Sequence, residues 1–106
     1  MPKRKINKII QELNKLIKEQ FPDFKGLYLY GSQVKGGSHK DSDVDVVAIF
    51  DDVSREKIFE LGGILADLMY KYDIYIDLHP YTPETIKRNP YYYNEVVNKG
   101  IYYDAA

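Results

Sequence analysis

The sequence predicts a small α/β fold, in which helices pack on a mixed sheet of three or more strands. Apolar residues recur at helical spacing in two long segments, residues 6–17 and 58–69. Three short segments rich in strand-forming residues occupy positions 26–30, 44–50 and 73–79. Glycine, proline and aspartate stand between these segments at turn positions. The expected order is therefore helix, strand, strand, helix, strand, helix.

Each predicted element has its own start or stop signal. The first helix ends at residues 21–23, Phe-Pro-Asp, because the residue before a proline avoids the helical conformation. The second helix begins after Ser54, a favoured N-cap residue. Its inward positions are expected to be Ile58, Leu61, Leu65, Leu68 and Met69. Pro80 is expected to stop the third strand. A short helix capped by Thr82 follows over residues 82–88, and a last helix lies over residues 91–100 with a terminal glycine.

The composition is that of an ordinary globular chain of 106 residues, which we take as one domain over residues 1–106. Hydrophobic residues make up 44% and charged residues 29%, and no apolar run approaches the ~20 residues of a membrane helix. The net charge of −1 provides no overall attraction to nucleic acid. The absence of cysteine excludes disulfides and thiolate metal sites. We therefore expect a cytoplasmic protein with neither a membrane nor a nucleic-acid partner.

Tyrosine is the exception in this composition, with eleven copies beside no tryptophan. Many of these tyrosines come late, at positions 91–93 and 102–103. These tyrosines fit two interpretations equally well: packing within a small domain, or a protein interface, where tyrosine is enriched. Successive helical residues point ~100° apart, so one helix face cannot bury all of residues 91–93. At least one is expected to be exposed to a partner protein or to a second copy of the chain in a homo-oligomer.

Two aspartates, Asp43 and Asp45, alternate with valines at the start of the second predicted strand. Side chains alternate along a strand, so both carboxylates share one face, with Cα atoms about 6.6 Å apart. Burying a carboxylate costs several kcal/mol unless it is paired or binds a metal. The third strand adds Asp73 and Asp77 on one face, of which Asp77 is favoured because apolar residues flank it. Three carboxylates fit a site for two divalent cations about 3.5–4 Å apart. His79 is expected to cap the strand end rather than bind metal.

The loop before these aspartates supplies groups that bind anions. Gly31-Ser32 follows an apolar strand, and Gly36 lets backbone N–H groups approach an anion closely. Lys35 and Lys40 are candidate phosphate contacts. Ser32 has no base near it in the sequence, so its hydroxyl is expected to bind phosphate rather than act as a nucleophile. A glycine turn followed by metal-binding acids is typical of phosphoryl transfer from a nucleoside triphosphate.

Gly31-Ser32, ten intervening residues and then Asp43-Val44-Asp45 resemble the signature of the polymerase-beta-like nucleotidyltransferase superfamily. Gly36, Ser42 and the apolar residues after the aspartates resemble its smallest members, often encoded as the antitoxin beside a HEPN-domain ribonuclease toxin. The resemblance implies a nucleotidyltransferase-like fold over nearly the whole chain.

The resemblance also implies roles for individual residues. Gly31 and Ser32 would hold the β- and γ-phosphates of ATP or another nucleoside triphosphate. Asp43 and Asp45 would be catalytic ligands of Mg²⁺, and the third acid maps best to Asp77. We expect Lys35, Gly36 and Ser42 to complete the nucleotide-binding site.

The implied reaction is Mg²⁺-dependent transfer of AMP, or another nucleoside monophosphate, to an acceptor hydroxyl with release of pyrophosphate. Two Mg²⁺ ions would act, one at the acceptor oxygen and one at the leaving pyrophosphate. Larger members carry an extra domain that holds the acceptor, for which 106 residues leave no room. We therefore expect a partner to bring the acceptor, and the family suggests AMPylation of a tyrosine on a HEPN-type toxin. Gln33 stands where many relatives have arginine, which keeps open a non-catalytic antitoxin that neutralises its partner by contact alone.

Overall fold

One mixed sheet organises the molecule in the computed structural model, which describes residues 2–35 and 43–105. Its strand order is β3-β2-β1-β4. The strands are β1 (Gly26–Tyr30), β2 (Val44–Ile49), β3 (Ile76–Tyr81) and β4 (Ile101–Asp104). β1 pairs antiparallel with β2 and β4, and β2 pairs parallel with β3. The predicted α/β class is confirmed, and β4 is a strand that the sequence analysis missed.

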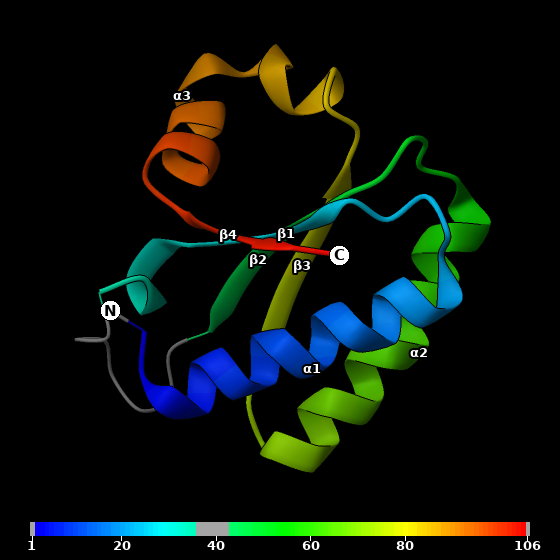
Figure 1. The fold of residues 1–106 in the computed structure, drawn as a ribbon, viewed down its shortest axis with the longest axis vertical. Helices are drawn as coiled ribbons and strands as arrows, with labels where there is room; N and C mark the ends of the chain where they lie inside the picture. The colour runs from blue at the N-terminus through cyan, green and yellow to red at the C-terminus, as the bar shows by residue number, and fades with distance from the viewer. Residues whose placement is uncertain (1, 36–42, 106) are drawn as a thin grey trace.

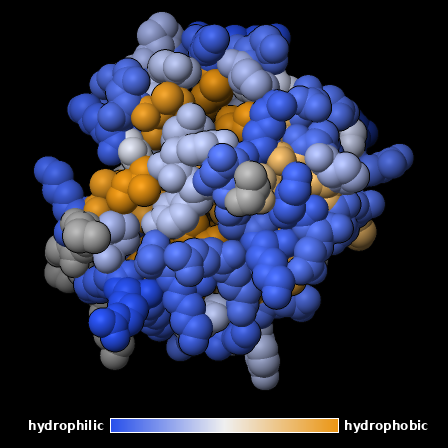
Figure 2. Space-filling view, in the orientation of Figure 1, coloured by the Kyte–Doolittle hydropathy of each residue, from blue (hydrophilic) through white to orange (hydrophobic). Residues whose placement is uncertain are grey.

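Helices cover the two faces of the sheet unequally (Figure 1). On one face lie the long helices α1 (Arg4–Gln20) and α2 (Arg55–Tyr72). On the other lies the C-terminal segment, residues 82–98, which contains η2 (Thr85–Arg88), α3 (Pro90–Tyr93) and η3 (Asn94–Asn98). Hydrophilic residues cover most of the visible surface over α1, whereas hydrophobic residues reach the surface around the C-terminal segment (Figure 2). Within the described ranges, no helix combines the length and apolar character needed to cross a membrane.

α1 forms because its apolar residues follow the helical repeat, and five of them are buried in the core that it shares with the sheet and α2. The buried positions are Ile6, Ile9, Ile10, Leu13 and Ile17. Each large aliphatic side chain that is fully buried contributes roughly 1.5–3 kcal/mol relative to its exposed state. The helix predicted over residues 6–17 is confirmed, and it extends to Arg4 and Gln20.

α2 is less deeply buried than predicted. The predicted N-cap is present, since Oγ of Ser54 accepts a hydrogen bond from the backbone N–H of Lys57 at 3.1 Å. Leu61 and Leu68 are buried, but Ile58 is 51% exposed, so its predicted inward position is wrong. Only a narrow stripe of α2 meets α1 and the edge strand β3, and Ile58 lies outside that stripe.

β3 begins three residues later than predicted, because α2 continues through Tyr72. Asp73 closes this helix as its C-cap, with a left-handed φ of 51°. The turn separates Asp73 from the strand, so the expectation that Asp73 shares a face with Asp77 is wrong.

Pro80 lies inside β3, although it was expected to end the strand. The carbonyls of Tyr75 and Tyr81 accept hydrogen bonds from the backbone N–H groups of Val44 and Phe50 at 2.9 and 3.0 Å. The odd-numbered residues of β3 therefore present their backbone groups to β2. The missing N–H of Pro80 faces the open edge of the sheet, where proline is tolerated.

The C-terminal segment has neither the boundaries nor the regular helices that were predicted. The helix expected over residues 82–88 is the shorter 3₁₀-helix η2, whose N-cap is Glu84, so the predicted cap at Thr82 is wrong, although Oγ1 of Thr82 accepts a hydrogen bond from the backbone N–H of Thr85 at 3.1 Å in the preceding turn. The helix predicted over residues 91–100 is the short α3, followed by the π-helix η3. After Gly100 the chain enters β4 and pairs with β1.

Gly100 lets this segment approach the sheet backbone to backbone. A Cβ atom at this position would meet the carbonyl oxygen of Val96 and, at 2.7 Å, that of Leu29. Neither backbone oxygen can move without disturbing η3 or β1. Gly62, in the middle of α2, is the opposite case, because nothing lies within 4 Å of an added Cβ.

We therefore predict that Gly100→Ala and Gly62→Ala change stability in opposite directions. Overpacking at Gly100 is expected to lower the free energy of unfolding by about 1–3 kcal/mol. Gly62→Ala is expected to raise it by about 0.5–1 kcal/mol, because alanine favours the helix more than glycine does. Urea unfolding followed by circular dichroism measures both. A neutral Gly100→Ala variant would contradict the close backbone contact.

Candidate active site

The register of the sheet brings the end of β1 beside the starts of β2 and β3. Asp45 lies opposite Tyr30 of β1 and opposite Asp77 of β3. One row across the sheet therefore consists of Tyr30, Asp45 and Asp77, and we call it the acid row. Val47 and Ile49 share the face of Asp45 by strand alternation and pack with the C-terminal segment. The acid row thus lies on the sheet face opposite to α1 and α2.

Asp43 stands immediately before β2 and is exposed. Its strand alternation with Asp45 places both on the face of the acid row. The hydrogen bond between the N–H of Val44 and the carbonyl of Tyr75 continues the β2–β3 ladder beyond Asp77. The structure therefore brings Asp43, Asp45 and Asp77 to one end of one sheet face.

The carboxylates at this end of the sheet repel one another. Burial raises the pKa of the Asp45 carboxyl above its ordinary value, and the carboxylates of Asp77 and Asp43 raise it further, whereas His79 acts in the opposite direction. A raised pKa means that the folded state holds this proton more tightly than the unfolded state does. The resulting stabilisation is present below the ordinary pKa and is lost as pH rises through the raised value. Ionisation of Asp45 therefore opposes folding, and a bound cation would relieve this cost.

His79 contacts the third acid directly. Its Nε2 lies 3.1 Å from Oδ1 of Asp77. His79 was expected to cap the end of the strand, but β3 continues to Tyr81 and the imidazole lies two residues along the same face. The contact restricts the orientation of the Asp77 carboxylate.

The glycine turn touches the acid row. Gly31 follows β1 with a left-handed φ of 79°, which glycine adopts without strain. A Cβ atom at Gly31 would lie 2.7 Å from Oδ2 of Asp45. The missing side chain therefore allows the loop backbone to lie against the carboxylate. Ser32, the next residue, is exposed at this point.

Among the other loop residues predicted to bind the nucleotide, the structure describes Lys35. Gly36, Ser42 and Lys40 lie outside the described residues. Lys35 lines a hollow of about 660 Å³ together with Arg4 and Tyr103, at the start of α1, so its phosphate contact stays a prediction. Gln33 is only 2% exposed, so its side chain points into the protein rather than toward solvent.

Two tyrosines that were not predicted as site residues meet at the acid row, Tyr30 within the row and Tyr92 of α3. The hydroxyls of Tyr30 and Tyr92 are 2.8 Å apart, and their rings meet edge to face with centroids 5.6 Å apart. Burial raises the pKa of both phenols, and the charges of Asp45 and Asp77 raise that of Tyr30 further. Both phenols therefore remain protonated at neutral pH. The hairpin register identifies Tyr30, but no local signal connects Tyr92 with the acids.

The carboxylate oxygens at this end of the sheet are of the kind that binds Mg²⁺, although the described residues do not form a complete set of ligands for it. Over residues 2–35 and 43–105, no group of three or more histidine, cysteine, aspartate and glutamate side chains is arranged to hold a metal ion. Mg²⁺ usually takes only one or two carboxylates and completes its shell with phosphate oxygens and water. The carboxylates of Asp43 and Asp77, which raise the pKa of Asp45, are oxygen donors of this kind.

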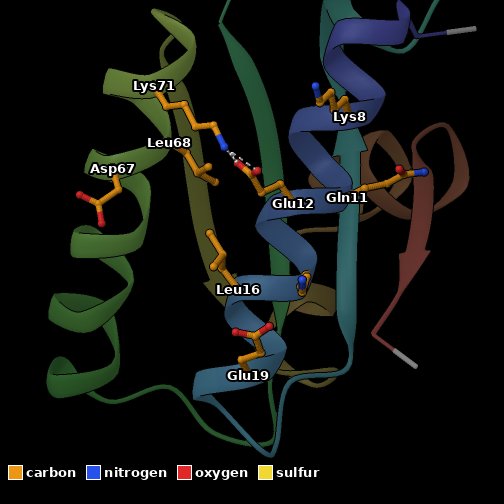
Figure 3. Close-up of a pocket in the computed structure, with 9 residues that line it drawn as sticks. Lys8, Gln11, Glu12, Leu16, Glu19, Asp67, Leu68 and Lys71 are labelled. Carbon is orange, nitrogen blue, oxygen red and sulfur yellow. Dashed lines mark hydrogen bonds and ion pairs between the residues drawn. The ribbon is translucent and has the colours of Figure 1, made fainter.

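A separate groove lies in the helical layer, between α1 and α2 (Figure 3). It has a volume of about 580 Å³, and the ion pair between Nζ of Lys71 and Oε1 of Glu12, 2.9 Å long, crosses it. Leu16 and Leu68 also line it. The sheet separates this groove from the acid row, so the two are distinct surfaces.

One known protein family matches most of the chain. The family model described as "Nucleotidyltransferase domain" matches residues 4–103. A sequence comparison with curated proteins gives no match.

Solved structures of toxin–antitoxin complexes contain chains of similar fold. A chain of a mutant MntA–HpeT complex is 23% identical, with a TM-score of 0.65 over 88% of this chain and 69% of that chain. A chain of a toxin–antitoxin complex with AMP-PNP is 24% identical, with a TM-score of 0.62 over 95% and 72% of the two chains. A complex of tri-AMPylated HEPN toxin with MNT antitoxin from Shewanella oneidensis gives 18% identity and a TM-score of 0.59 over 95% and 71%. These likenesses show a shared fold, and the match over residues 4–103 shows that the chain belongs to the nucleotidyltransferase domain family.

Proposed function

We propose that this protein is a Mg²⁺-dependent nucleotidyltransferase that transfers AMP, or another nucleoside monophosphate, to a hydroxyl of a HEPN-type toxin and so acts as its antitoxin. The observation that carries the proposal is the acid row in contact with the glycine turn: Asp77 pairs with Asp45, and Gly31 leaves room for the Asp45 carboxylate. This arrangement joins phosphate-binding backbone to metal-binding carboxylates.

Each part of the candidate site has a proposed task. The backbone of Gly31 and the backbone and hydroxyl of Ser32 bind the β- and γ-phosphates. Asp43, Asp45 and Asp77 hold Mg²⁺, with His79 restricting the orientation of Asp77 through their 3.1 Å contact. Lys35, Gly36 and Ser42 complete the nucleotide site. When bound, Mg²⁺ neutralises phosphate charge and lowers the barrier to attack at phosphorus.

The chemistry exchanges one bond at the α-phosphorus. The acceptor oxygen forms a new P–O bond, and the bond from the α-phosphorus to the oxygen that bridges to the β-phosphate breaks. Pyrophosphate leaves with that oxygen, and the acceptor proton passes to water or to a carboxylate of the acid row. The protein contributes mainly orientation and charge placement, as is typical of phosphoryl transfer.

Two neighbouring structures support the choice of substrate and partner. One is a toxin–antitoxin complex with AMP-PNP, and the other holds a tri-AMPylated HEPN toxin with an MNT antitoxin. A tyrosine hydroxyl, the acceptor that the family resemblance implies, is the first acceptor to test. Nucleoside triphosphates and Mg²⁺ are cytoplasmic, and we place the reaction there.

A contact-only antitoxin is the second candidate. It is favoured by one observation, that the carboxylates are neighbours without forming a complete metal cage in the described residues. Gln33 gives this candidate less support than its sequence position suggests, since the buried side chain points away from the solvent side where a triphosphate arrives.

We predict that Mg²⁺ with ATP stabilises the folded protein. A ligand that binds only the folded state adds about 2.7 kcal/mol to the free energy of unfolding at a concentration 100 times its Kd. The double variant Asp43→Asn, Asp45→Asn is expected to lose this increment. The matched control is Asp67→Asn, Asp73→Asn, which removes the same charge from α2 and its C-cap. Thermal unfolding with and without Mg²⁺-ATP measures the difference, and an equal increment in both double variants would place the nucleotide elsewhere.

Transfer itself is tested with the protein encoded beside this one. Purified protein, Mg²⁺-ATP and that HEPN-type product are mixed, and intact-mass spectrometry follows the product. The wild type is expected to add one or more AMP units, whereas Asp45→Asn is expected to lower the rate by at least about 100-fold, as for loss of one strong electrostatic contact in an active site.

The controls separate the two candidate functions. If the ribonuclease is neutralised equally by wild type and Asp45→Asn with no mass change, the contact-only antitoxin is correct. If neither protein binds the product, the antitoxin role fails and the nucleotide-binding prediction stands by itself.

A further inference from the structure

Another cavity lies on the same sheet face as the acid row. It has a volume of about 400 Å³ and is lined by Tyr81, Thr85, Ile86, Arg88, Asn89 and Tyr92. Small-molecule sites in proteins are commonly of this size and are largely apolar with a few polar groups. We call it the tyrosine cavity. Its walls come from β3, η2 and the start of α3.

The tyrosine cavity lies along the same sheet face as the acid row. Tyr81 lies on the strand that carries Asp77, four residues along the same face, which is about 13 Å between Cα atoms. Tyr92 lies between the cavity and the acid row, because it lines the cavity while its hydroxyl lies 2.8 Å from that of Tyr30 in the acid row. A nucleotide whose phosphates lie at the acid row can therefore reach the cavity with its base.

The apolar walls suit a flat aromatic ring. The rings of Tyr81 and Tyr92 have centroids 5.8 Å apart and are inclined at 51°, so together they form an angled aromatic surface. Ile86 is 3% exposed and adds an aliphatic surface. Stacking on aromatic side chains is favourable for every nucleobase and strongest for the larger purines.

The polar groups at the rim are hydrogen-bond donors. The guanidinium of Arg88 is planar and only donates, and it also stacks on aromatic rings. Oδ1 of Asn89 accepts from the backbone N–H of Tyr92 at 3.1 Å, which directs the amide Nδ2 of Asn89 to act as a donor. Purines present ring-nitrogen acceptors at N3 and N7, and so complement such a rim.

We propose that the tyrosine cavity is the nucleobase subsite of this protein and that it selects purine over pyrimidine nucleoside triphosphates. The inference rests on the proposed function, since it assumes that the triphosphate lies at the acid row. It adds Tyr81, Tyr92 and Arg88 as residues that determine specificity.

Isothermal titration with Mg²⁺ and four nucleotides, ATP, GTP, CTP and UTP, tests the inference, with inorganic tripolyphosphate as the probe that lacks a base. The wild type is expected to bind ATP or GTP at least tenfold more tightly than CTP and UTP. Tyr81→Ala is expected to weaken purine binding by roughly tenfold, the effect of losing one aromatic stacking partner. Tripolyphosphate binding is expected to be unchanged, because the phosphates do not touch the cavity.

Three further variants keep the test independent of folding defects. Tyr81→Phe retains the ring and is expected to bind as the wild type does. Arg88→Ala removes an exposed side chain and is expected to lower the preference for purines. Tyr91→Ala is the matched control, because Tyr91 is on the same short helix as Tyr92 but is 75% exposed and does not line the cavity.

The outcomes separate this inference from the proposed function. If tripolyphosphate and ATP both bind but Tyr81→Ala and Arg88→Ala leave ATP binding unchanged, the subsite is wrong and the proposed function survives. If the wild type binds no probe at all, both are wrong. A wild type that binds all four nucleotides equally also overturns the purine subsite.

Discussion

The parallel pairing of β2 with β3 is the constraint on which the rest of this structure depends. Its register sets Asp45 directly beside Asp77, so that two carboxylates share one row of one sheet face. Parallel neighbours require a crossover connection, which α2 provides. The antiparallel pairing of β2 with β1 then brings Gly31 against Asp45. A shift of one residue in either register would turn Asp45 or its neighbour to the opposite face.

One face of the sheet carries most of the buried apolar core, and the other carries the candidate site. Beneath α1 and α2 lies the larger cluster of buried apolar side chains, including five residues of α1 and both buried leucines of α2. The other face holds a smaller apolar cluster around Val47 and Val96, edged by tyrosines, of which Tyr30 and Tyr92 hydrogen-bond to each other. This arrangement leaves the acid row uncovered by the long helices, at the cost of repulsion among its carboxylates. A divalent cation is the ligand that would offset that repulsion.

Local sequence signals predicted the elements that depend on local physics. The helical repeat of α1, the alternation of Asp43 with Asp45 and the cap at Ser54 are such cases. Predictions were wrong where contacts between residues far apart in the sequence determine the structure. β4 is four residues long and exists through its pairing with β1, and the edge position of β3 is what admits Pro80. Tyr92 reaches the site from 62 residues beyond Tyr30, a contact with no local signature. Gln33 stands beside the phosphate turn in sequence, yet its burial follows from the packing of the whole loop.

The central claim, that the acid row binds a divalent cation, is tested most directly by the titration of one carboxyl. Carbon-13 NMR of the aspartate carboxyls gives the pKa of Asp45 with and without Mg²⁺, and Asp77→Asn provides the matched variant. The account predicts a pKa above the ordinary aspartate value in the metal-free wild type, a lower pKa in Asp77→Asn, and a marked fall on addition of Mg²⁺. A pKa of Asp45 that does not respond to Mg²⁺ would contradict the metal site and the mechanism built on it.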